Sequence, residues 1–101
     1  MRLKLHQKGF LLVALNQAET AWDYALVAKA LAEYGGKGRH RVNTIRIALD
    51  EMASGGLIER VEERLDDGTH VETGKVLFRY RLTDFGRRRM KDTGLMGGVS
   101  R

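Results

Sequence analysis

Polar and basic side chains with the means to recognise a partner are concentrated in one short segment, residues 41–47. The candidates are Arg41, Asn43, Thr44, Arg46 and Ile47. An arginine can donate two hydrogen bonds to O6 and N7 of a guanine, and an asparagine can pair with an adenine. The residues just before this segment that would hold backbone phosphates are Lys37, Arg39 and His40. The pattern predicts contacts to base edges in the major groove, supported by phosphate contacts upstream.

Two pairs of residues have a second interpretation that the sequence leaves open. Asn43 and Thr44 can equally cap the first turn of a helix, so Arg46 is the stronger candidate for a base contact. Trp22 and Tyr24 could form a stacking platform or an effector pocket. Aromatic side chains flanked by aliphatic ones usually belong to a core or a dimer interface, and we assign these two no ligand.

Catalytic and metal-binding residues follow no recognised pattern. The chain has no cysteine, and its three histidines are too scattered for the spacing of metal ligands. No acid pair, serine or histidine stands at a spacing that implies a nucleophile and its base. We therefore expect no enzyme activity, no metal and no cofactor.

The net charge of the chain is basic, but it is unevenly distributed. A formal net charge of +5 favours an anionic partner. Residues 36–47 hold basic side chains without an acid, whereas residues 50–75 hold eight acids and three bases. A second basic cluster consists of Arg79, Arg81, Arg87, Arg88, Arg89 and Lys91. Its simplest interpretation is a solvated helix face whose cations complement the helix dipole.

Apolar spacing predicts three helices in the first half of the chain. Leucines line one face of a helix over residues 5–18. The sequence Thr20-Ala21-Trp22-Asp23 has the form of a capping box, which would open a second helix that ends at Gly35-Gly36. A third helix over residues 42–54 has its apolar residues on one side and the DNA-contact candidates elsewhere.

Alternating residues predict two antiparallel strands over residues 57–65 and 76–82, joined as a wing. The connection is either a tight hairpin at Asp67-Gly68 or a longer mobile loop, and we favour the longer loop. The wing residues are Asp67, Gly68, Thr69, His70 and Lys75. Thr83 can cap a short C-terminal helix through about residue 91. One domain, residues 1–93, is thus followed by a flexible tail, residues 94–101.

These elements together form an α+β winged helix-turn-helix pattern with three helices, a two-stranded wing and a short C-terminal helix. Over about residues 9–92 the chain resembles regulators of the PadR-like group and, more loosely, MarR proteins. The matching residues are Tyr24, Leu26, Thr44, Ile45, Leu49, Met52, Gly56, Leu57, Ile58, Tyr80, Leu82, Thr83 and Gly86. The resemblance implies a sequence-specific DNA-binding transcriptional regulator, with repression as the expected action.

The chain departs from that family at three places. Arg46 replaces a tyrosine that usually follows the apolar residue of the recognition helix, and the C-terminal dimerisation helices are reduced to one short segment. The wing is acidic at Asp66, Asp67 and Glu72, although a wing that grips phosphates should be basic. The alternative is therefore a winged helix adaptor whose acidic wing contacts a protein partner.

Partners and location follow from the same pattern. Double-stranded DNA is the expected partner, and the apolar surplus of the first helix predicts a homodimer through that helix and the C-terminal one. The longest apolar run, residues 10–15, is far below a membrane span, so we expect a cytoplasmic protein that does not contact a membrane. The residues do not specify an effector.

Overall fold

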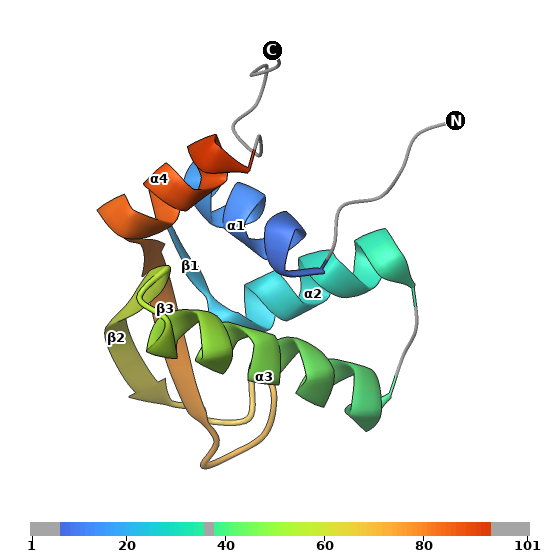
Figure 1. The fold of residues 1–101 in the computed structure, drawn as a ribbon. Coiled ribbons are helices and arrows are strands. Elements are labelled where there is room, and N and C mark those ends of the chain that lie inside the picture. The colour runs from blue at the N-terminus through green and yellow to red at the C-terminus, as the bar shows by residue number, and fades with distance from the viewer. Residues whose placement is uncertain (1–6, 36–37, 94–101) are drawn as a thin grey trace.

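The computed structural model describes residues 7–35 and 38–93, apart from the side chain of Arg39. These residues form four helices and one three-stranded antiparallel sheet. In chain order the elements are α1 (Gln7–Ala18), β1 (Thr20–Trp22), α2 (Asp23–Tyr34), α3 (Arg39–Ser54), β2 (Ile58–Leu65), β3 (Val76–Leu82) and α4 (Asp84–Asp92) (Figure 1). The predicted α+β class is confirmed, and the predicted tail lies outside the described residues.

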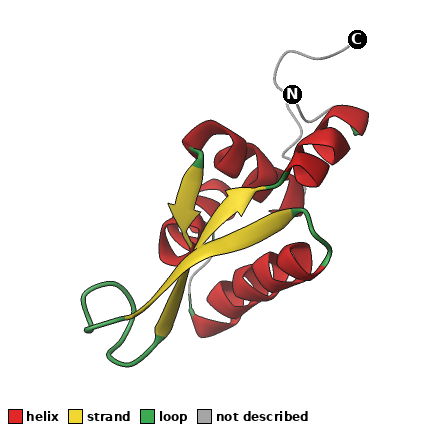
Figure 2. Ribbon diagram, turned by 90° about the vertical axis from the view of Figure 1, so that its left-hand side faces the viewer, coloured by secondary structure: helices red, strands yellow, loops and turns green. Residues whose placement is uncertain are grey.

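The core lies between one face of the sheet and the helices. Figure 2 shows the strands in front of the helices, so that among the described residues no helix covers the outer face of the sheet. The largest fully buried apolar and aromatic side chains come from all four helices and from β2 and β3: Leu11, Leu15, Leu26, Leu49, Met52, Ile58, Leu77, Tyr80 and Met90. Each side chain of this size stabilises the fold by roughly 1.5–3 kcal/mol through its burial.

The leucines of helix α1 are buried inside the domain. Leu11, Leu12 and Leu15 are at most 6% exposed and belong to the core cluster. These leucines thus belong to the domain's own core, whereas Phe10 and Val13 of the same helix are only partly buried against it.

Strand β1 corrects the predicted start of the second helix. Thr20, Ala21 and Trp22 pair antiparallel with β3, and the sheet order is β1-β3-β2, so the sheet has three strands rather than two. Helix α2 then begins at Asp23, with no side-chain cap. The capping box was the wrong interpretation because the unpaired edge of β3 offers backbone hydrogen bonds to a segment that contains β-favouring threonine and tryptophan.

Helix α3 begins earlier than predicted, whereas α4 begins with the predicted cap. Helix α3 starts at Arg39 and not at Val42, so the predicted phosphate-binding segment supplies its first turn. The predicted cap of α4 is confirmed, since the Thr83 hydroxyl accepts a hydrogen bond from the Gly86 amide at 2.9 Å. No helix in residues 7–35 and 38–93 has the length and apolarity needed to cross a membrane.

Candidate nucleic-acid interface

Helix α3 has a buried side and an exposed side, as its apolar spacing predicted. The buried side consists of Ile45, Ala48, Leu49 and Met52. The exposed side consists of His40, Arg41, Asn43, Ile47, Asp50, Glu51 and Ser54. Three of the five candidates for base contact, Arg41, Asn43 and Ile47, are therefore accessible to a partner.

The first turn of α3 has no cap and no acid. Gly38 occupies the N-cap position with φ +91°, and no side chain there accepts a hydrogen bond from the helix amides. The first turn carries cations instead, and the Arg41 guanidinium donates a hydrogen bond to the Gly35 carbonyl at 3.3 Å. Free amides and basic side chains thus meet at the positive end of the helix dipole, an arrangement that suits an anion.

Thr44 does not cap the helix. Its hydroxyl donates a hydrogen bond to the His40 carbonyl at 2.9 Å, one turn earlier in the same helix. Such a bond keeps the side chain close to the backbone, so Thr44 has less reach than its exposed neighbour Asn43. Lys37 and the side chain of Arg39 lie outside the described residues.

Arg46 is held by a buried acid rather than presented to solvent. Its guanidinium lies 3.3 Å from the Asp23 carboxylate, and the two side chains are only 18% and 2% exposed. The same carboxylate accepts hydrogen bonds from the amides of Tyr24 at 2.7 Å and Phe78 at 3.2 Å. Asp23 therefore joins α2, α3 and β3, and a base contact by Arg46 would require its guanidinium to leave this ion pair.

The sequence did not predict that Asp23 pairs with Arg46, because Asp23 was assigned to a capping box. The available signal was the position of Arg46, which directly follows the buried Ile45 and so stands at the border of the buried side. An arginine at such a border commonly needs a carboxylate partner.

The second half of α3 is acidic, but its acids are paired. Asp50 lies 2.8 Å from Arg60 of β2, and Glu51 lies 2.8 Å from Lys8 of α1. These pairs reduce repulsion of a nearby phosphate without attracting one. The attractive part of α3 is confined to its first two turns.

The wing loop, residues 66–75, is the longer connection that we favoured, and its backbone is organised around Asp66. The carboxylate accepts hydrogen bonds from four loop amides, those of Gly68, His70, Val71 and Glu72. Burial would raise the pKa of Asp66, but these bonds outweigh it and hold the pKa below its usual value. Asp66 is therefore a structural acid, and it does not contribute to an acidic contact surface.

The remaining wing residues are exposed, and one of them reaches back to the body of the domain. Asp67 accepts hydrogen bonds from the amide and hydroxyl of Thr69, and Lys75 is exposed at the end of the loop. The ring of His70 stacks on Tyr24 with centroids 4.1 Å apart, and Tyr24 in turn stacks on Trp22 at 6.2 Å. The two aromatics are thus partly exposed members of a stack that attaches the loop to α2.

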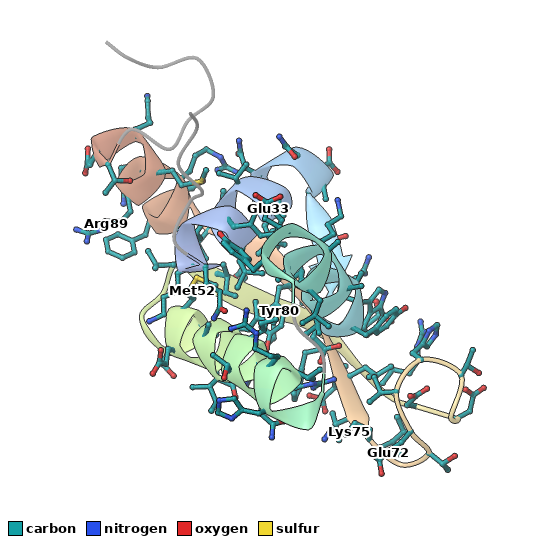
Figure 3. All side chains as sticks on the ribbon, turned by 90° about the vertical axis from the view of Figure 1, so that its right-hand side faces the viewer. Glu33, Met52, Glu72, Lys75, Tyr80 and Arg89 are labelled. Atoms are coloured by element: carbon teal, nitrogen blue, oxygen red, sulfur yellow. The ribbon has the colours of Figure 1, made fainter. Side chains whose placement is uncertain are left out.

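The second basic cluster is divided between the sheet and α4. Arg79 and Arg81 pair with glutamates of β2, whereas Arg88, Arg89 and Lys91 are exposed on α4. Figure 3 labels Arg89 on α4 and Glu72 and Lys75 on the wing, at opposite ends of the molecule. The cations of α4 are therefore separate from the wing.

Metal chemistry has no centre in the described part of the chain, where no group of three or more potential ligands lies together. Comparison with known proteins found no matching family model, curated protein or solved structure. The function is accordingly inferred from the geometry and charge of the surfaces described above.

Proposed function

We propose that the protein is a winged helix DNA-binding regulator that reads the major groove with the first two turns of α3. The order of elements and the β1-β3-β2 sheet are compatible with a winged helix, in which the third helix is presented on the surface. The resemblance to PadR-like regulators points in the same direction.

The observation that carries the proposal is the cationic, uncapped beginning of α3. Basic side chains at a helix N-terminus oppose the helix dipole and lower helix stability by a few tenths of a kcal/mol each. A phosphate would reverse the sign of that interaction, because it accepts from the free amides and pairs with the cations. Local instability at an exposed helix start is expected where the start serves binding.

The proposed contacts divide between positioning and specificity. Lys37, Arg39 and His40 hold phosphates, while Arg41 and Asn43 reach base edges. Arg46 fixes the orientation of α3 through Asp23 and contacts a base only if that pair opens. The wing adds few phosphate contacts, so a homodimer that binds two half-sites would supply the missing affinity.

Regulation by such a protein would be repression in the cytoplasm, by occupation of a site that the transcription machinery needs. The predicted α1 and α4 dimer surface is supported on the α4 side alone, where Phe85 is 45% exposed. The adaptor alternative is supported by the exposed acids of the wing, Asp67 and Glu72.

Salt-dependent binding to mixed-sequence duplex DNA tests the proposal. Arg41→Gln should weaken binding and reduce the slope of log K against log salt by about one, because one phosphate or base contact is lost. Lys29→Gln is the matched control, since it removes the same charge from an exposed position on α2 that lies outside α3 and α4. Equal effects of the two variants, or no binding at low salt, would reject the α3 interface and favour the adaptor.

A further inference from the structure

Two apolar surfaces on this molecule remain uncovered and carry opposite charge. The first, here called the wing patch, consists of Leu65 and Val76, which are 68% and 41% exposed. Leu65 and Val76 are directly opposite each other in the β2 and β3 register, so their side chains share one face. With Glu63 and Arg64 they line a hollow of about 200 Å³.

The wing patch contrasts with the other end of the same two strands. There the pair Ile58 and Leu82 has the same aliphatic character but is at most 3% exposed, because it faces the core. An aliphatic pair left in water at the wing does not stabilise the isolated domain. It becomes favourable if another surface covers it.

The wing patch is held in place before any partner arrives. Asp66 binds the amides of His70, Val71 and Glu72, and the His70 ring stacks on Tyr24. A surface whose backbone is already ordered loses little conformational entropy on binding. Three exposed acids flank it, Glu63, Asp67 and Glu72, and they outnumber the two exposed cations, Arg64 and Lys75.

The second surface, here called the α4 patch, has the complementary composition. Phe85 is 45% exposed and lines a hollow with three cations, Arg88, Arg89 and Lys91, and one acid, Asp92. These three cations form no ion pair with residues 7–35 or 38–93. Among the described residues, the patch therefore presents an exposed aromatic side chain beside three cations and one acid, so its net charge is positive.

We infer that the wing patch of one copy of this chain binds the α4 patch of a second copy. Leu65 and Val76 would cover Phe85, while the wing acids face the α4 cations, so apolar and electrostatic complementarity act together. The two patches lie at opposite ends of the molecule, as Figures 1 and 3 show, so no copy can satisfy its own pair. This association uses different residues from the start of α3 and does not rest on DNA binding.

Sedimentation of the full chain without DNA tests the contact. Wild type should associate reversibly in the micromolar range, as expected for small interfaces. Leu65→Glu and Phe85→Glu should each remain monomeric. An equimolar mixture of these two variants should form a dimer, because each supplies the patch that the other lacks.

Matched variants keep the result interpretable. Ile47→Glu makes the same change at a residue that is 56% exposed and outside both patches, so it should associate like wild type while losing DNA binding. Arg88→Glu with Arg89→Glu reverses the charge of two of the three cations and leaves Phe85 in place, and it should weaken association at least tenfold. Circular dichroism identifies any variant that fails to fold.

Three outcomes would overturn the inference. The first is a wild-type chain that stays monomeric at hundreds of micromolar. The second is association that persists both in Leu65→Glu and in the double variant Arg88→Glu with Arg89→Glu. The third is a mixture of Leu65→Glu and Phe85→Glu that stays monomeric although each variant is folded. Association that resists Ile47→Glu while DNA binding is lost would show that the two activities are separate.

Discussion

Helices α3 and α4 begin in opposite ways, and the difference separates a helix start that can bind an anion from one that is capped within the fold. Thr83 caps α4, Asp84 lies in its first turn, and Arg89 and Lys91 lie in its last turn. Helix α3 begins at Arg39, after the N-cap residue Gly38, and has no side-chain cap, no acid in its first turn and no base in its last. The charges of α4 complement the helix dipole, whereas the first turn of α3 leaves its amides and cations available to an anion.

The wing loop resembles α4 rather than α3 in this respect. Asp66 gives its loop amides a carboxylate acceptor, which the amides at the start of α3 lack. Backbone amides thus find side-chain acceptors at the start of α4 and in the wing loop, whereas the amides at the start of α3 have none among the described residues. The start of α3 coincides with the basic residues that the sequence singled out.

The largest expected loss of stability comes from a substitution at the start of α4. A Cβ at Gly86 would lie 2.1 Å from the Leu57 carbonyl oxygen, and backbone cannot yield as a flexible side chain can. Gly86→Ala should therefore lower the free energy of unfolding by about 4 kcal/mol or more, measured by urea denaturation. Gly38→Ala is the control at the start of α3, where a Cβ meets nothing within 4 Å and only the positive φ is strained. It should cost about 1–2 kcal/mol. A smaller loss at Gly86 than at Gly38 would contradict the tight contact.

A threonine substitution in each helix gives a smaller and sharper contrast. Thr83→Ala removes the acceptor for the Gly86 amide and should cost about 1 kcal/mol, or roughly 4–8 °C in Tm. Thr44→Ala removes a hydroxyl that bonds only within α3, and alanine has the higher helix propensity. Its Tm should stay the same or rise. Equal losses from both substitutions would show that Thr83 is not a special cap.

The smallest expected change in stability comes from a substitution that should have the opposite effect on DNA binding. His40→Glu places an acid in the first turn of α3, where it complements the helix dipole and should stabilise the fold by about 0.5 kcal/mol. The same acid repels phosphate, so DNA affinity should fall about tenfold in a fluorescence anisotropy titration. His40→Gln adds no charge and keeps a hydrogen-bond donor for phosphate, so it should leave stability unchanged and weaken DNA binding much less than His40→Glu. A gain in stability without loss of binding would place the DNA elsewhere on the molecule.

Several features of the fold and of the candidate interface depend on residues that are close together in the sequence. The buried side of α3 follows from apolar residues repeating every three or four positions, and the wing strands follow from alternation at a period of two. The cap at Thr83 also acts over three residues. Each of these features depends on contacts within one turn or one strand, so the sequence was sufficient to predict them.

Other features required segments far apart in the chain to meet. β1 forms because β3, about sixty residues later, offers Thr20 to Trp22 an unpaired edge, and local propensity alone favoured a helix start there. Arg46 is occupied because Asp23 comes from α2 and is buried against β3, which no spacing within α3 could reveal. The wing and α4 lie at opposite ends of the molecule, which also depends on how the elements pack (Figures 1 and 3). Periodicity specifies which side of an element is apolar, but only tertiary packing decides what covers that side and what it leaves exposed.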